Sequence, residues 1–256
     1  MIKSLKSASM RSTQLAPLAL VAALLTLSAC TDDPSSDAAA TPTAATSEVA
    51  PEPAPEVASD AAAQSERVEA PAPEGEIDVA ALMAEQPLPD VVIGDPDAPV
   101  TIVEYASMTC DHCAAFHANT YPDLKRDYID TGKAKLIIRE FPFDPRATAA
   151  FMLARCTPNE GRTAMVDVLF SQSEEWAHSE EASTKLLSVA RLAGMSEEGF
   201  RACLADKDLQ AKVGQTMERG RDEFGVNSTP TFFVNGKKYI GALPPEQMGA
   251  IIEDAF

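Results

Sequence analysis

The sequence predicts an α/β domain in which a β-α-β unit and a later β-β-α unit enclose an all-helical insertion. Two apolar runs of strand length, at residues 100–106 and 135–141, flank a stretch with helical periodicity. A long stretch with the same periodicity follows, and the pair Asn235-Gly236 then separates two short strand-like runs, as in a β-hairpin. These three observations define the order of the elements.

The first unit consists of strand Val100–Ala106, helix Cys113–Tyr128 and strand Lys135–Phe141. Two parallel strands joined by a helix form a right-handed crossover in almost all proteins. We therefore expect these strands to pair in one sheet, with the helix on one face.

The insertion is predicted over about residues 144–223. Its apolar residues recur with the spacing of helices, and glycines at 161, 194 and 225 break or end the segments. The predicted helices are Pro145–Arg155, Arg162–Gln172, Ala182–Ala193, Glu197–Ala205 and Leu209–Phe224.

The second unit begins with strand Thr231–Val234 and returns through Lys238–Ile240. Pro244–Phe256 is predicted as a final helix, since proline is favoured in the first turn.

Residues 1–30 have the pattern of a signal segment. Three basic residues precede the apolar run Leu15–Ala29, which is too short to span a bilayer. The run ends in Leu27-Ser28-Ala29-Cys30, which resembles a bacterial lipobox. That resemblance implies cleavage before Cys30 and a lipid anchor on it; the alternative is a secreted protein in which Cys30 is incidental.

Residues 31–76 are predicted to be a disordered tether that leads into a domain over 77–256. The tether is rich in Ala, Pro, Glu, Ser and Thr, and its only basic residue is Arg67. Such a composition buries too little apolar surface to offset the entropy of ordering. A short helix, Ile77–Glu85, is expected where the domain begins.

The charge excludes some partners, and the cysteine count indicates a compartment. The chain has a net charge of −18, and removal of a signal with three bases and no acids would make it −21. This argues against nucleic acid and against binding of anionic lipid through a basic patch. Apart from Cys30, four cysteines remain, an even number that suits an oxidising compartment.

The segment Cys110-Asp111-His112-Cys113 lies between the first predicted strand and its helix. At a helix N-terminus, unpaired N–H groups and the helix dipole favour a thiolate on Cys110 and lower its pKa. Cys113 lies one turn into the helix and suits a resolving role, while a protonated His112 would add positive charge. A structural metal site or an inert disulfide is the alternative, but zinc needs four ligands and a second CxxC or CxxH motif is missing.

These features resemble the thioredoxin fold, in its DsbA-like branch with a helical insertion. The dithiol after a strand, Glu104 six residues before Cys110, the insertion, and Thr229-Pro230 before the strand of the hairpin carry the likeness over about residues 90–256. The resemblance implies a buried Glu104 that moves a proton to or from the resolving thiol. It also implies a cis Pro230 against the disulfide, with Thr229 tuning reactivity and pairing with the substrate chain.

The dipeptide inside the dithiol sets the expected redox potential. DsbA itself has proline where this chain has Asp111, and a carboxylate beside a thiolate raises the thiol's pKa. A higher thiol pKa makes the disulfide a weaker oxidant, so we predict a potential less oxidising than that of DsbA. His117 is expected on the helix surface, and no role is predicted for His178.

Cys156 and Cys203 both fall in the helical insertion. In an oxidising compartment a structural disulfide between them is expected. The alternatives are two buried thiols or a second redox-active pair.

By this resemblance the chain is expected to be a thiol:disulfide oxidoreductase that oxidises protein thiols outside the cytoplasm, in the periplasm for a bacterium with two membranes. It would act as a monomer without cofactor or metal, held to a membrane by lipid on Cys30. Its partners would be proteins with free thiols and a quinone-linked membrane oxidase of the DsbB type. Alternatives are a reductase or isomerase of the same fold, a lipid-anchored metal carrier that uses the dithiol, or a surface lipoprotein with a vestigial dithiol.

Overall fold

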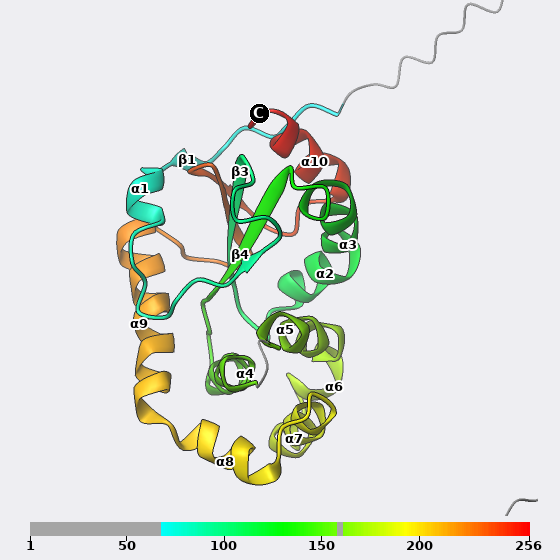
Figure 1. Cartoon of the computed structure of the whole chain (residues 1–256), viewed down its shortest axis with the longest axis vertical. Helices are drawn as coiled ribbons and strands as arrows, with labels where there is room; N and C mark the ends of the chain where they lie inside the picture. Colours follow the sequence, from blue (N-terminus) through cyan, green and yellow to red (C-terminus); the bar gives the residue numbers. More distant parts are fainter. Residues whose placement is uncertain (1–67, 158–160) are drawn as a thin grey trace, which may run out of the picture. The chain divides into compact units, whose positions relative to one another are not determined.

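A mixed six-stranded sheet lies at the centre of the domain in the computed structural model, which describes residues 68–157 and 161–256 (Figure 1). The order across the sheet is β1-β6-β5-β3-β4-β2. Strands β3 and β4 are parallel, and all other pairs are antiparallel. The strands are β1 Gly75–Glu76, β2 Val92–Ile93, β3 Val100–Ala106, β4 Ala134–Glu140, β5 Thr231–Val234 and β6 Lys237–Ile240.

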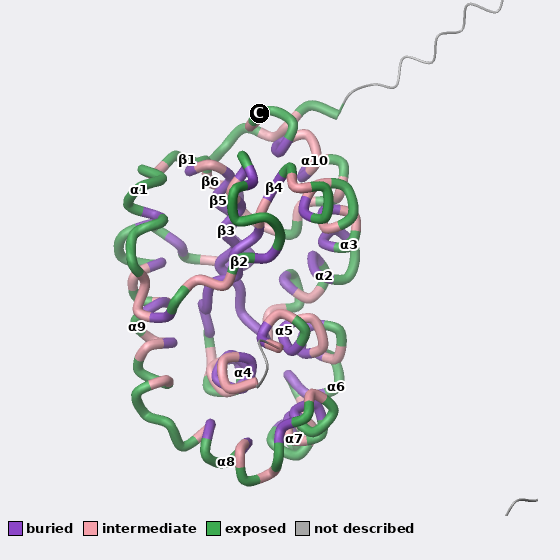
Figure 2. Tube along the Cα trace, in the orientation of Figure 1, coloured by how far each residue is buried: buried purple, intermediate pink, exposed green. Residues whose placement is uncertain are grey.

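Helices cover both faces of this sheet. The α2, α3 and α10 helices contribute to the larger apolar core with Ile102 and Leu136, and α1 and α9 contribute to the smaller core with Val103 and Tyr105. Figure 2 shows that the central strands consist largely of buried residues, coloured purple. The bounds are α1 Val79–Leu82, α2 Asp111–Asn119, α3 Tyr121–Leu124, the π-helical turn η1 Lys125–Ile129, and α10 Pro245–Glu253.

The insertion lies between β4 and β5 and consists of six helices in the described residues. They are α4 Pro145–Cys156, α5 Arg162–Ser171, α6 Ser173–Trp176, α7 Ala182–Leu192, α8 Glu197–Ala205 and α9 Lys207–Phe224. The α4 helix contacts α5, α8 and α9, and α5 also packs against α2. The predicted β-α-β … β-β-α order with an all-helical insertion is thus confirmed.

A buried ion network joins the end of β4 to the insertion. The Glu140 carboxylate is inaccessible to solvent, and its Oε1 atom accepts hydrogen bonds from Nε of Arg155 at 2.7 Å and from Nη2 of Arg162 at 3.0 Å. Burial by itself raises the pKa of Glu140, but the charges of Arg162 and Arg155 outweigh it and lower that pKa. Two guanidinium groups from α4 and α5 are therefore fixed to one carboxylate of the sheet.

One glycine lets α9 approach the sheet closely. A Cβ atom on Gly220 would lie 2.6 Å from Cε1 of Tyr105, which is a fully buried side chain of β3. A larger residue there would displace the helix or the ring.

Several local details differ from the sequence-based expectation. The single helix expected over Cys113–Tyr128 is divided at Thr120, because Pro122 near the start of α3 has no N–H group to continue the α2 hydrogen bonds. Two short edge strands, β1 and β2, were not predicted.

The expected tether and the first strand overlap. Gly75 and Glu76 fall in the stretch predicted to be disordered, yet they pair with Lys238 and Lys237 of β6. Backbone hydrogen bonding orders them without any apolar side chain, which composition does not reveal. The signal segment, Cys30 and residues 31–67 of the tether lie outside the described residues.

Candidate functional site: a dithiol at the N-terminus of α2

Cys110 occupies the N-cap position of α2, immediately before the first helical residue. Its backbone is extended, with φ −90° and ψ 117°, as is usual for an N-cap residue. The sulfur therefore lies beside the unpaired N–H groups of the first turn. Cys110 follows β3, which ends at Ala106 and runs parallel to β4, so it lies beyond the carboxyl end of that strand.

The two thiols have different environments. Cys110 is partly exposed, whereas Cys113 is fully buried, and both are free thiols in this structure. Hydrogen bonds from the Cys113 thiol, and from the backbone N–H groups of Cys113 and His112, lower the pKa of Cys110 to about 5. Burial, together with the nearby charges, raises the pKa of Cys113 well above its ordinary range. At neutral pH the accessible sulfur is thus the thiolate and the buried one is the thiol.

A loop from the C-terminal unit faces Cys110 from the opposite side. The Thr229-Pro230 peptide bond is cis, and Sγ of Cys110 lies 3.3 Å from the Thr229 carbonyl oxygen, to which it can donate only in its protonated form. These residues precede β5, which pairs antiparallel with β3 and brings Thr231 opposite Tyr105. The sheet register therefore brings together two segments that are more than 100 residues apart.

Glu104 lies behind the dithiol. Side chains alternate along a strand, so Glu104 shares the α2 face of β3 with Ile102 and Ala106. It is fully buried, and its Oε2 atom lies 3.0 Å from Nε2 of His117. The charge of Glu104 is among the causes that raise the pKa of Cys113, after burial itself.

The expectation of a surface His117 is wrong. His117 is 8% exposed, and its ring stacks on Phe170 of α5 with ring centroids 4.0 Å apart. The signal that could have located it is the spacing of Cys113, Phe116 and His117 at i, i+3 and i+4, which places all three on the same face of α2.

The two residues between the cysteines are exposed. Asp111 is in the first turn of α2, and its Oδ1 atom lies 3.2 Å from Nε2 of His178, which follows α6. The dipeptide therefore contacts the insertion. No local pattern indicates this contact, because 67 residues separate its partners.

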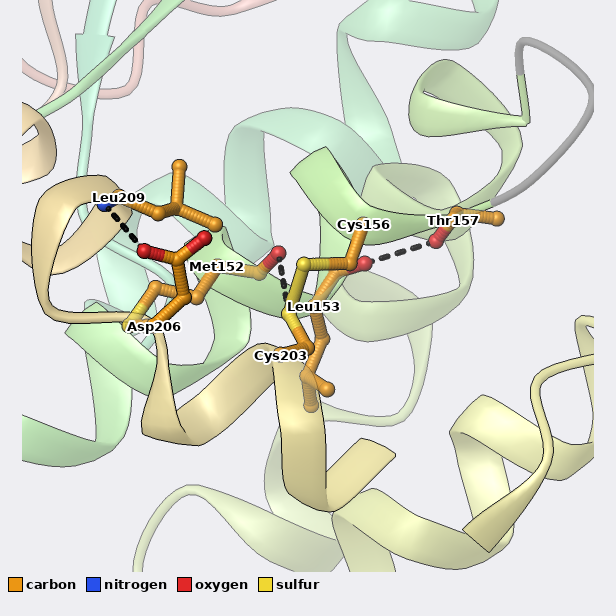
Figure 3. The surroundings of a disulfide bond; sticks show 7 residues. All are labelled: Met152, Leu153, Cys156, Thr157, Cys203, Asp206 and Leu209. Carbon is orange, nitrogen blue, oxygen red and sulfur yellow. Dashed lines mark hydrogen bonds between the residues drawn. A yellow bond between two sulfur atoms is a disulfide. The ribbon is translucent and has the colours of Figure 1, made fainter. Parts of the chain in front are cut away.

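Cys156 and Cys203 are joined by a disulfide inside the insertion (Figure 3), with their Cα atoms 6.1 Å apart. It links the last residue of α4 to α8. The bond is separate from the Cys110–Cys113 pair, so the second pair of cysteines does not compete for the first.

The described residues contain neither a cluster of metal ligands nor a membrane-spanning helix. Among residues 68–157 and 161–256, no three His, Cys, Asp or Glu side chains are grouped as ligands for a metal ion. Over the same ranges, no helix is long and apolar enough to cross a membrane.

An accessible low-pKa thiolate at a helix N-terminus, a buried partner thiol and an opposing cis-proline loop define a thioredoxin-fold dithiol protein. The family model described as thioredoxin matches residues 87–254. The crystal structure of alpha-DsbA1 from Wolbachia pipientis is 32% identical, with a TM-score of 0.62 over 66% of this chain and 92% of that protein. The chain therefore belongs to the thioredoxin family, and within it to the DsbA-like proteins.

Other relatives agree with this assignment. A Rickettsia conorii protein named as a protein-disulfide oxidoreductase is 34% identical over 148 residues, which cover 57% of this chain and 53% of the relative. The chain thus matches about half the length of that protein. BdbD from Bacillus subtilis, in its oxidised form, has the same fold, with a TM-score of 0.59 over 73% of this chain and 98% of BdbD at 21% identity.

Proposed function

We propose that this protein is an extracytoplasmic thiol:disulfide oxidoreductase that oxidises the thiols of other proteins. The observation that carries the proposal is the asymmetry of the dithiol: Cys110 is accessible with a pKa lowered to about 5, and Cys113 is buried with a raised pKa. A low pKa of the accessible thiol stabilises the reduced form, and this makes the disulfide an oxidant.

In the proposed reaction a substrate thiolate attacks Sγ of Cys110 in the Cys110–Cys113 disulfide. The S–S bond breaks, Cys113 leaves as a thiolate and takes up a proton, and a mixed disulfide joins Cys110 to the substrate. The second substrate thiol then loses its proton and attacks the substrate sulfur of the mixed disulfide. Cys110 leaves as a thiolate, and the substrate is released with a new disulfide.

The Thr229-Pro230 loop supports substrate binding at this site. The Thr229 carbonyl lies against Cys110, immediately before β5 begins. An extended substrate chain could pair there with the backbone of the Thr229-Pro230 loop. Chain addition of this kind supplies main-chain hydrogen bonds without demanding a particular sequence. This suits an enzyme whose substrates share only a thiol.

The reduced dithiol needs an electron acceptor, for which we propose a quinone-linked membrane oxidase of the DsbB type. A lipid anchor on Cys30 would keep the domain near such a membrane partner. Loss of palmitate labelling in a Cys30→Ala variant would support the anchor, and unchanged labelling would contradict it.

The direction of the reaction is tested by the redox state of the dithiol in cells. Alkylation of free thiols after acid quenching would trap Cys110 and Cys113 as they stand. We expect the pair to be oxidised at rest, whereas a pair found reduced would identify a reductase. A variant with serine at both positions has no thiol to alkylate there, so it is the reference for a dithiol that takes up no reagent.

A further inference from the structure

Four buried polar atoms without a protein hydrogen-bond partner occur behind the dithiol, three on residues that line one pocket and one on Glu104, which contacts His117 of that pocket. They are Oε1 of Glu104, Nδ1 of His117, the hydroxyl oxygen of Tyr121 and Oδ1 of Asp167. Buried polar atoms are rarely left unpaired, so a cluster of four indicates an exchange of protons or water at this place. None of these four side chains takes part in the bond-forming steps of the proposed reaction.

His117, Tyr121 and Asp167 line a pocket of about 400 Å³ between α2, α3 and α5. Its other lining residues are Ala114, Ala118, Val168 and Ser171. The pocket is large enough for several water molecules, and the polar atoms in its wall could hold them.

The His117 ring is fixed so that its two nitrogens serve different sides. Nε2 lies 3.0 Å from Oε2 of Glu104, on the side of the sheet and the dithiol. Stacking on Phe170 and edge contact with Phe116, with ring centroids 5.4 Å apart, hold the ring plane. Nδ1 is the remaining nitrogen, buried and without a protein partner.

We propose that His117 transfers the proton of Cys113 from Glu104 to the pocket lined by Asp167. This inference rests on the proposed function, because it concerns the proton that the resolving thiol must lose and regain. His117 acts through Glu104 rather than on the reacting sulfur, so it is a positioning residue of the reaction.

When Cys113 attacks Sγ of Cys110 in a mixed disulfide, the Cys110–Cys113 bond forms and the partner leaves as a thiolate. The Cys113 proton goes to Glu104, Glu104 gives a proton to Nε2 of His117, and Nδ1 releases a proton through pocket water to Asp167. In the reverse direction Cys113 leaves as a thiolate, and each of these transfers runs backwards.

Charges on every neighbouring element bear on this route. Glu104 of β3 and Tyr121 of α3 both contact His117, and Cys113 lies on the same face of α2 as His117. The charges of His117 and of the Lys125 ammonium in η1 both act on Asp167 of α5. Burial raises the pKa of Asp167, and the charges of His117 and Lys125 act in the opposite direction. A carboxylate with a raised pKa is a better proton acceptor near neutral pH than a fully solvated one.

The test is the closing rate of a mixed disulfide on Cys110. When reduced protein reacts with Ellman's reagent, the Cys110 thiolate forms the mixed disulfide and releases a first coloured thionitrobenzoate. Attack by Cys113 then releases a second, and the rate of this second release is followed from pH 5 to pH 9 in a stopped-flow instrument. His117→Gln retains an amide that can bond Glu104 but cannot pass a proton. We expect release about 10- to 100-fold slower than wild type at pH 7, and a rate that approaches wild type as the pH rises.

Asp167→Asn keeps the test decisive if the buried His117 variant fails to fold. It should slow the release in the same pH range, and the double variant should be no slower than His117→Gln alone, because both changes interrupt one route. Glu174→Gln on α6 is the control for loss of an acid in the insertion. Melting curves confirm that each variant is folded.

Two failures can be told apart. Wild-type release at every pH with His117→Gln and Asp167→Asn would overturn the relay alone, as would additive slowing that does not depend on pH. If the wild-type protein itself forms no disulfide and releases no thionitrobenzoate, both the proposed function and the relay are wrong.

Discussion

Nε2 of His178 lies 3.2 Å from Oδ1 of Asp111, so a histidine of the helical insertion contacts the dipeptide between Cys110 and Cys113. Both side chains are largely exposed. A protonated His178 would offset the negative charge of Asp111 near Cys110. The Asp111 charge is not among the main causes that set the Cys110 pKa.

The first prediction concerns the redox potential. Asp111→Asn should make the disulfide more oxidising and His178→Ala less oxidising, because the first removes a negative charge and the second removes its partner. Exposed ion pairs contribute about 0.2–1 kcal/mol, so each shift should be roughly 5–20 mV. Equilibration with glutathione buffers measures both, and equal shifts of the same sign would contradict the prediction.

The second prediction concerns the Cys110 thiolate. Cys113→Ala removes the largest cause that lowers the Cys110 pKa, so the thiolate absorbance should titrate well above the wild-type midpoint of about 5. Cys113→Ser is the matched control, since its hydroxyl can still donate to the sulfur and should preserve most of the lowering. Identical titrations for the alanine and serine variants would show that the Cys113 donor is unimportant.

The same pKa predicts how stability depends on pH. The pKa of a cysteine thiol is about 8.5 in an unfolded chain, and that of Cys110 in the folded protein is about 5. The depressed pKa therefore stabilises the reduced protein fully above about pH 8.5, and this contribution is lost as the pH falls toward 5. The free energy of unfolding of the reduced form, relative to the oxidised form, should rise with pH across this window in urea titrations.

The third prediction concerns the Cys156–Cys203 disulfide. The bond closes a loop between residues separated by 47 positions, for which the chain-entropy estimate is about 4 kcal/mol. Replacement of both cysteines by serine should lower the free energy of unfolding by about 2–4 kcal/mol and leave the closing rate of the Cys110 mixed disulfide unchanged. A large loss of that rate in the folded variant would indicate a redox role for the second pair.

The fourth prediction concerns the Glu140 network. Glu140→Gln leaves Arg162 buried without its counter-charge and should destabilise the fold by about 3–5 kcal/mol. Glu197→Gln is the control, because its ion pairs with Arg191 and Arg201 are exposed and their loss should change stability little. The lowered pKa of Glu140 adds stability above the ordinary glutamate range that is lost as the pH falls below it.

The sequence predicts the fold well because its periodic signals are local. Apolar runs and helical periodicity identify β3, β4 and five of the six helices described in the insertion, whereas the four-residue α6 was not predicted. Asn235-Gly236 marks the hairpin through the positive φ angles of both residues. The edge strands β1 and β2 have two residues each. They pair through backbone groups, which composition does not reveal.

The candidate site is predictable only in part. The resemblance identifies the residues that belong to short sequence motifs. These are the Cys110–Cys113 dithiol, Glu104 at its fixed distance before the dithiol, and Thr229-Pro230 before β5. His117, Asp167 and His178 acquire their places through the packing of the insertion on α2, a tertiary contact. Such contacts leave no short-range pattern, and for this reason the surroundings of the dithiol could not be derived from the chain alone.

The pairing of β1 with β6 places the start of the domain and the dithiol at opposite ends of the sheet. Gly75 and Glu76 join the sheet beside the hairpin, at the end where β3 begins, whereas Cys110 follows the far end of β3, roughly 20 Å along a strand of seven residues. The polypeptide enters the domain at the pole opposite its reactive sulfur. If the domain were attached through this N-terminal end, Cys110 would lie at the end of the domain farthest from the attachment point.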